Sequence, residues 1–267
     1  MFSLHKLLVH VNVPALANGE LRAKRIAIEN GEFNIWNVND STTNLDLLFG
    51  GDEEPSTEKS LNLPEITVER LSIKKFGFSM LDQFAEADSA RKSSPNKIDW
   101  DNLILNDINL DARKIEIKED VTLNLVNLAM REGHGLDVNT FRGKIKMKYK
   151  SGVKGIYIDD LRYDDGLSTL RSKSFSLRFN EFSDFSDFCE KVEMAADFDN
   201  PLLDFRTLDY FAGLHDNNLK LLVNGPVTGP VANLRSPELS ITSGSGRTDI
   251  LLGFKLIGLP EIESSII

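Results

Sequence analysis

The chain consists mainly of short segments in which apolar and polar residues alternate, and turns separate these segments at short intervals. Alternation with a period of two is typical of a β-strand that has one buried and one solvated face. Segment Lys144–Tyr149 is the clearest case, because Ile145, Met147 and Tyr149 would share one face while lysines occupy the other. A chain with this pattern is expected to fold mainly as β-sheet.

One strand unit occurs twice, since Arg25–Ile35 aligns without a gap with Arg70–Met80. A repeated strand unit predicts a sheet that grows by addition, in which each unit buries its apolar face against its neighbours. The predicted fold is therefore mainly β: an elongated, curved antiparallel sheet shaped like a groove or taco, with one or two short helices. Such a fold favours a long surface over a compact catalytic pocket.

Two local features predict how the first strands turn and bend. Asn30-Gly31 lies between alternating segments and predicts a hairpin, because both positions accept a positive φ angle. At Glu69-Arg70 the apolar residues change parity, which predicts a bulge or bend. The expected strands are Leu4–Val13, Leu21–Ile28, Glu32–Val38, Ile66–Phe78, Leu103–Leu110, Lys114–Ile117, Val121–Met130, Lys144–Tyr149, Gly155–Ile158, Ser174–Phe179, Glu238–Thr242 and Thr248–Leu256.

Other segments predict helices, kinks and loops. Leu202–Leu214 has apolar residues near a 3.6-residue period and predicts one short helix, whereas Phe182–Phe198 fits either a helix or a strand. The Gly-Pro pairs within Leu219–Leu234 predict a kinked or edge strand, because proline cannot donate to a ladder. Gly50–Ser60 and Glu86–Lys97 are polar and rich in turn residues, and they predict flexible connections.

Composition argues against several classes of partner. The net charge of −10 gives no overall electrostatic attraction to nucleic acid, and it argues against docking on anionic lipid headgroups through a basic patch. The single cysteine, Cys189, excludes an internal disulfide, and its apolar neighbours predict a small buried side chain. No apolar run is long enough for a membrane-spanning helix.

Motifs for catalysis or metal binding are not found in the sequence. The histidines His5, His10, His134 and His215 are scattered without zinc spacing, and they are interpreted as structural. Acidic residues such as Asp159-Asp160 and Asp164-Asp165 do not match a calcium loop and are interpreted as solvated. The sequence therefore predicts a protein that is not an enzyme and has no cofactor or metal.

The apolar faces of the strands remain as the candidate functional surface. Their residues are predicted to line one face of the sheet, with an ordinary sandwich core as the alternative. The candidate lining residues are Phe76, Phe78, Ile115, Ile117, Leu123, Leu125, Ile145, Met147, Tyr149, Ile156 and Ile158.

Two parts of the chain resemble known envelope proteins. Residues 4–48 resemble the membrane-proximal part of AsmA-like proteins, and residues 98–262 resemble the TamB-type members of that family found in Bacteroidetes. The first resemblance rests on Leu4–Val13, Gly19–Leu21, Arg25–Ile35 and Asn44–Leu48; the second rests on Ile108–Asp111, Met130–Leu136, Asn218–Leu234 and Leu256–Ile262. The resemblance divides the chain into AsmA-like strand repeats (1–50), repeat strands flanked by flexible loops (51–97) and a TamB-type β-groove segment (98–267).

The resemblance implies a periplasmic protein, attached to the inner membrane in its full-length form, that conducts phospholipid acyl chains between the inner and outer membranes. It also implies an outer-membrane barrel assembly partner, which would dock through a region missing here; the family's anchor helix is missing too. Two alternatives remain open. One is a scaffold for outer-membrane protein assembly with a filled core, and the other is a carbohydrate-binding or carbohydrate-hydrolysing β protein, for which Trp36 and Trp100 offer little aromatic platform.

Overall fold

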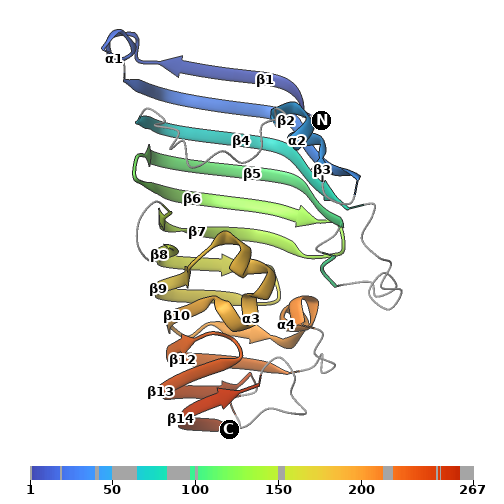
Figure 1. Ribbon diagram of the computed structural model, residues 1–267. Coiled ribbons are helices and arrows are strands. Elements are labelled where there is room, and N and C mark those ends of the chain that lie inside the picture. Colours follow the sequence, from blue (N-terminus) through green and yellow to red (C-terminus); the bar gives the residue numbers. More distant parts are fainter. Residues whose placement is uncertain are drawn as a thin grey trace.

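The computed structural model describes residues 2–18, 20–39, 42–49, 65–82, 97–99, 102–149, 154–212, 219–244, 246 and 248–258. A 14-stranded sheet dominates the molecule, and its strands stack in one long column from the N-terminal to the C-terminal part of the chain (Figure 1). Neighbouring strands are antiparallel, except that β2 and β4 run parallel. The predicted mainly β, elongated and curved fold is confirmed.

The continuous path of the sheet follows the order β1-β2-β4-β5-β6-β7-β8-β9-β10-β12-β13-β14. Its strands are β1 (Phe2–Val11), β2 (Leu21–Asn39), β4 (Ile66–Leu81), β5 (Asn102–Ile117), β6 (Asp120–Glu132), β7 (Asp137–Lys148), β8 (Lys154–Asp164), β9 (Thr169–Phe179), β10 (Glu193–Phe198), β12 (Lys220–Gly229), β13 (Asn233–Ser243) and β14 (Asp249–Ile257). The remaining elements are the short strands β3 (Thr42–Thr43) and β11 (Leu202–Asp204), and the short helices α1 (Val13–Ala17), α2 (Asn44–Phe49), η1 (Phe182–Asp187), α3 (Phe188–Lys191) and α4 (Phe205–Ala212).

The repeated strand units lie side by side. Each paired residue of β2 lies opposite the residue 45 positions later in β4, from Leu21 opposite Ile66 to Trp36 opposite Leu81. The two units therefore present matching side chains to the same face at the same height. The sheet also continues across both predicted domain boundaries, because β2 pairs with β4 and β4 pairs with β5.

The predicted hairpin at Asn30-Gly31 is wrong, because β2 runs without interruption from Leu21 to Asn39. Asn30 has a φ of 52°, and its repeat counterpart Lys75 has a φ of 50°, so both are irregular positions within continuous strands. Asn-Gly suits such a bulge for the same reason that it suits a turn. Gly31 also leaves room for Phe76, whose Cε2 would lie 2.8 Å from a Cβ at this position.

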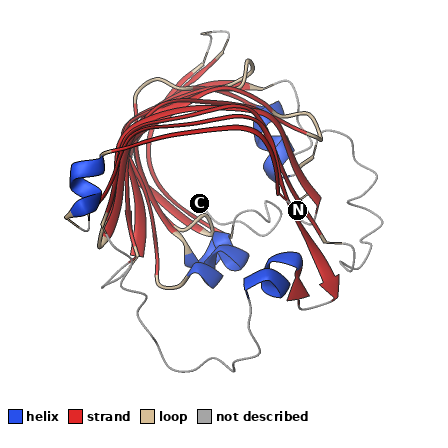
Figure 2. Cartoon of the chain, turned by 90° about the horizontal axis from the view of Figure 1, so that it is seen from above, coloured by secondary structure: helices blue, strands red, loops and turns tan. Residues whose placement is uncertain are grey.

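Bulges in neighbouring strands curve the sheet. In β2, β4 and β5 two consecutive residues are exposed on the outer face, namely Lys24-Arg25, Glu69-Arg70 and Arg113-Lys114. The predicted change of face at Glu69-Arg70 is confirmed, although the register of β4 against β2 and β5 does not shift there, so the position is a break shared by neighbouring strands. Asp159-Asp160 makes a similar break in β8, where the register against β7 does shift and Asp160 has a φ of 55°. Each bulge adds a residue to the outer face, so the sheet bends towards the inner face. Viewed along the column, the strands form an arch (Figure 2).

Other sequence predictions are refined by the structure. Leu21–Ile28 and Glu32–Val38 are one strand, as are Leu103–Leu110 and Lys114–Ile117. The predicted helix is confirmed as α4, although its first residues form β11 instead, and Phe182–Phe198 divides into η1, α3 and β10. Pro226 lies where the register of β12 against β13 shifts, as its missing N–H requires. The predicted loops Gly50–Ser60 and, apart from Lys97, Glu86–Lys97 lie outside the described residues.

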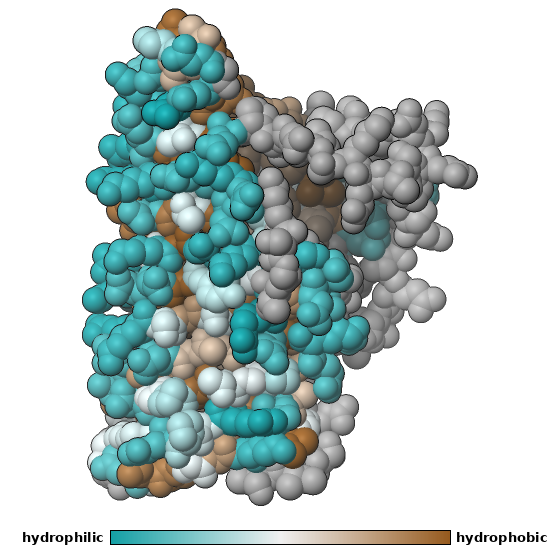
Figure 3. Space-filling model, turned by 60° about the vertical axis from the view of Figure 1, so that its left-hand side comes forward, coloured by the Kyte–Doolittle hydropathy of each residue, from teal (hydrophilic) through white to brown (hydrophobic). Residues whose placement is uncertain are grey.

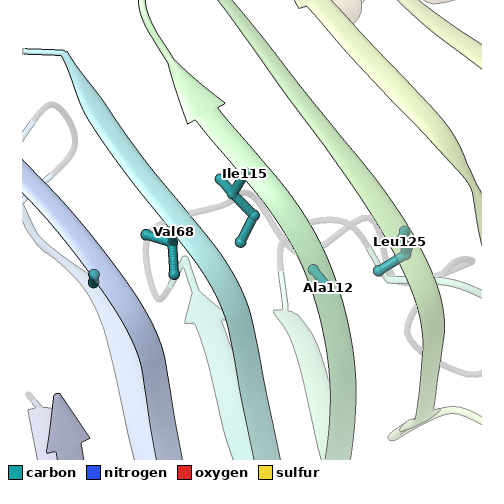
Figure 4. Close-up of a cluster of buried hydrophobic side chains, with 5 residues drawn as sticks. Val68, Ala112, Ile115 and Leu125 are labelled. Atoms are coloured by element: carbon teal, nitrogen blue, oxygen red, sulfur yellow. The ribbon is translucent and has the colours of Figure 1, made fainter. Parts of the chain in front are cut away.

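Two apolar clusters hold the sheet together. The first spans β2 to β6 and centres on Ala23, Val68, Ala112, Ile115 and Leu125, whose labelled members lie on the same side of neighbouring strands (Figure 4). The second centres on Val223, Val227 and Leu239 in β12 and β13. Both clusters are built from cross-strand neighbours, so they stabilise the inner face along the length of the column.

Candidate functional site

Apolar residues on the inner face lie opposite one another and form rows that run along the column. One row crosses eight strands, and it contains Leu21, Ile66, Ile117, Val121, Met147, Ile156, Leu177 and Met194. Adjacent strands lie about 4.8 Å apart, so seven spacings make this row about 34 Å long. The inner face therefore carries an uninterrupted apolar track.

Two further rows widen this track into a surface. One contains Leu123, Ile145, Ile158, Phe175, Ala196 and Val227. The other contains Leu7, Ile28, Ile73, Leu110, Leu128, Phe141, Tyr163 and Leu170. We call the surface formed by these three rows the inner apolar surface.

The structure brings most of the predicted lining residues together on this surface. Ile117, Met147, Ile156, Leu123, Ile145 and Ile158 lie in the rows, and Leu125 and Ile115 lie in the first apolar cluster beside them. Phe76 and Phe78 lie nearer the other ends of the strands, opposite Ile108 and Leu105. Tyr149 follows the end of β7, where its hydroxyl donates to the carbonyl of Lys118 at 2.9 Å.

The list of candidate lining residues missed members of the same rows, among them Ile73 and Phe175. Ile73 differs in parity from Ile66 in the same strand, and the sequence indicated this change as a bulge or bend at Glu69-Arg70. Since both Glu69 and Arg70 are exposed on the outer face, Ile73 lies on the inner face with Ile66. Two consecutive charged residues mark the places where the inward-facing positions change parity, as at Glu69-Arg70 and Asp159-Asp160. This sequence feature could have identified the remaining members of the rows.

The inner apolar surface is only partly shielded from solvent. Most of the predicted lining residues are half-buried, and only Ile115, Leu125 and Ile158 are fully buried. The described strands of the column belong to one sheet, so a sandwich core with a second facing sheet is not what these residues form. In the space-filling view, the wall in front is largely hydrophilic, while hydrophobic side chains line the recess behind it (Figure 3).

Short helices cover one part of the arch. Both α3 and α4 lie in front of the strands from β8 to β12 (Figure 1). The ring of Phe185 in η1 contacts that of Phe179 with centroids 4.9 Å apart, and Phe188 lies 6.1 Å from Phe185. Phe179 is 3% exposed and Val192 is 0% exposed. Side chains of η1 and α3 therefore pack against the end of β9.

A buried carboxylate anchors the start of α4. Asp204 is 0% exposed, and its two oxygens accept hydrogen bonds from Nε and Nη2 of Arg206 at 2.9 and 2.7 Å. Lys220 Nζ lies 3.1 Å from the same carboxylate. The bond from Arg206 holds the pKa of Asp204 well below its usual range, and it outweighs the opposing effect of burial.

Asp165, predicted to be solvated, is instead buried beside this anchor. It accepts hydrogen bonds from the Tyr163 hydroxyl at 2.9 Å and the Thr207 hydroxyl at 2.7 Å. Burial, and then the charge of Asp165, raises the pKa of Tyr163. Ser168 links the two carboxylate sites, because its hydroxyl donates to Thr207 and accepts from the backbone N–H of Asp204. The loop between β8 and β9 is thereby fixed to α4.

A second buried contact joins α4 to the end of β6. The hydroxyl of Tyr210 donates to Glu132 Oε2, and the backbone N–H of His134 donates to the same oxygen at 2.6 Å. Burial raises the pKa of Glu132, but the hydrogen bonds from Tyr210 and His134 outweigh this and leave that pKa lowered. For Tyr210, burial is the main cause of a raised pKa, followed by Glu132.

Replacement of Tyr210 by phenylalanine is expected to lower the free energy of unfolding by about 1–3 kcal/mol, because Glu132 keeps its burial but loses a donor. Urea unfolding followed by circular dichroism measures this change. Tyr157→Phe is the matched control, since Tyr157 lies on the outer side of β8, and a change below about 0.5 kcal/mol is expected there. Equal losses in the two variants would contradict a structural role for the Glu132 contact.

The buried carboxylates of Asp204, Asp165 and Glu132 hold α4 against the sheet through their hydrogen bonds. Within the described ranges, no group of three His, Cys, Asp or Glu side chains converges to hold a metal ion. Cys189 is half-buried in α3, and burial raises the pKa of its thiol, which makes the thiolate less accessible. The predicted small buried side chain is thus only partly buried.

Comparison with protein-family models, with curated proteins and with solved structures found no match to this chain. Among the described residues, no helix is long and apolar enough to cross a membrane. The geometry of the sheet is therefore the main basis for a functional proposal.

Proposed function

We propose that this chain is a non-enzymatic section of an apolar groove that conducts phospholipid between the inner and outer membranes of a cell envelope. The observation that carries the proposal is the inner apolar surface, whose residues align across consecutive strands and are mostly half-buried. The periplasmic setting and the attachment to the inner membrane follow from the resemblance to AsmA-like and TamB-type proteins, and they are part of the same proposal.

The energetics of an acyl chain support a groove of this kind. Moving a sixteen-carbon tail into water costs roughly 12 kcal/mol at about 0.8 kcal/mol per CH₂. An apolar surface that runs along the whole path lowers this cost without any chemical step. The twelve strands of the continuous path extend for about 50 Å, which exceeds the roughly 30 Å thickness of a hydrocarbon core. One such section would therefore span part of the distance between two membranes.

A scaffold for outer-membrane protein assembly is a second candidate. The packing of Phe185 against Phe179 favours it, because side chains from η1 occupy the arch at that height. A scaffold would act through partner proteins and would have no need for an open apolar surface elsewhere. The two candidates therefore differ in whether lipid occupies the arch beside β4 to β7.

Native mass spectrometry tests the groove. The chain is produced in a bacterial periplasm, and bound lipid is extracted and identified. An Ile145→Asp, Met147→Asp variant places two carboxylates in the inner apolar surface, and it is expected to lose nearly all co-purified phospholipid, because burying a charge against an acyl chain is costly. Met147→Asp alone is the milder variant if the double change prevents folding.

The matched control carries the same charges on the opposite face. Thr122→Asp and Asn124→Asp lie on the outer side of β6, opposite Lys146 and Lys144. This control is expected to retain lipid at the wild-type level. Wild-type protein that is folded and free of lipid would favour the scaffold, as would equal lipid content in the inner-face and outer-face variants.

A further inference from the structure

Three arginines form a ladder on the outer face of the sheet. Arg142 in β7 lies directly opposite Arg162 in β8, which lies directly opposite Arg171 in β9. All three side chains are exposed, and their strand neighbours Phe141, Tyr163 and Leu170 belong to the inner apolar surface. The ladder therefore lies behind the groove, on the solvent side of the arch.

The ladder is electrostatically unfavourable for the protein alone. Like charges directly opposite one another on a sheet destabilise it. In the part of the chain that the structure describes, none of these three guanidinium groups forms an ion pair with a carboxylate. Other arginines do form such pairs, namely Arg22, Arg70, Arg113, Arg131, Arg178 and Arg206. Asp160, whose pKa is lowered mainly by the hydrogen bond from Lys144 and in part by the charge of Arg162, offsets some of this positive charge without forming an ion pair with Arg162.

The ladder also borders a hollow. The three arginines line a depression of about 520 Å³ together with hydroxyl and amide groups of Thr140, Thr169 and Asn127. Among the described residues that line it, Asp164 is the one carboxylate, and its Oδ1 accepts a hydrogen bond from the backbone N–H of Gly166 at 2.7 Å. Several cationic donors, neutral donors and a concave shape thus meet in one place.

We propose that this arginine ladder is a binding site for phosphate groups, separate from the groove. A guanidinium group presents a planar fork of N–H donors that matches two oxygens of a phosphate. Neighbouring strands lie about 4.8 Å apart, so adjacent arginines can share one phosphate or hold two linked phosphates. The proposal is independent of lipid conduction, because the residues of the ladder lie on the opposite face from the inner apolar surface.

Calorimetric titration with pyrophosphate at low ionic strength tests the site, and cosedimentation with phosphatidylcholine vesicles that contain phosphatidic acid is the parallel arm. Arg162→Gln removes the central donor and is expected to weaken binding by about tenfold or more. Without ligand, the same variant is expected to melt at an equal or higher temperature at low salt, because like-charge repulsion is relieved. Arg171→Gln is expected to behave in the same way.

Arg25→Gln is the matched control, since Arg25 is an exposed arginine on the outer face of β2. It is expected to bind both probes as the wild type does. Binding of pyrophosphate would assign free phosphate as a sufficient ligand, whereas binding to the phosphatidic acid vesicles alone would assign a lipid phosphate. The proposal is overturned if the wild type binds neither probe, or if Arg162→Gln and Arg171→Gln bind as tightly as Arg25→Gln.

Discussion

Replacement of Asp204 by asparagine is expected to lower the free energy of unfolding by about 2–4 kcal/mol at neutral pH. The carboxylate of Asp204 is wholly buried and accepts both arms of the Arg206 fork, with Lys220 close by. Asparagine keeps the size of the side chain but has no charge and only one acceptor oxygen. The expected consequence is a loosened α4 and an earlier unfolding transition in urea.

The destabilisation caused by Asp204→Asn should depend on pH in a defined direction. The pKa of Asp204 is lowered in the folded state, so its stabilisation is complete above the unfolded-state pKa of about 3.9 and is lost as the pH falls through the folded-state value. The difference between wild type and Asp204→Asn is therefore expected to be constant near neutral pH and to shrink below about pH 4. Asp199→Asn, at an exposed position nearby, is the control and should change the stability by less than about 0.5 kcal/mol. A difference that grows on acidification would contradict the role of the Arg206 bond.

Gly229→Ala is expected to destabilise the protein by about 3–5 kcal/mol. Gly229 ends β12 with a φ of +107°, a backbone conformation that side-chain-bearing residues rarely adopt. A Cβ there would lie 2.3 Å from the carbonyl oxygen of Asn233, and that oxygen belongs to the backbone and cannot rotate away. The strand connection between β12 and β13 would have to shift, and thermal unfolding measures the result.

Gly246→Ala separates the two causes of this destabilisation. Gly246 also has a positive φ, of +68°, but a Cβ there would meet no atom within 4 Å. Its replacement is expected to cost about 1–2 kcal/mol, from backbone strain alone. If both alanine variants lost the same stability, the close contact with Asn233 would not contribute.

The strand pattern of the sequence was enough to predict the class of fold. Alternation in Lys144–Tyr149 placed Ile145 and Met147 on one face, and the structure confirms that placement. The repeat of Arg25–Ile35 in Arg70–Met80 predicted growth by addition, and the two units indeed pair. These predictions succeeded because side-chain direction in a strand depends only on local backbone geometry.

Predictions that depended on distant partners were less successful. Asn30-Gly31 was interpreted as a turn, yet pairing of β2 with β1 and β4 makes it an irregular position in a long strand. Asp165 was interpreted as solvated, yet Thr207, far along the chain, buries and satisfies it. In both cases the local sequence is compatible with two environments, and contacts with other strands select one of them.

The sequence by itself determined that the protein is a mainly β, elongated sheet with one apolar face, because apolar and polar residues alternate along each strand with a period of two. Only the tertiary structure decided which residues align into rows, since the register and the bulges depend on pairing between strands. The same is true of Arg142, Arg162 and Arg171. An overall charge of −10 argued against a basic patch, but cross-strand pairing gathers three scattered positive charges at one place.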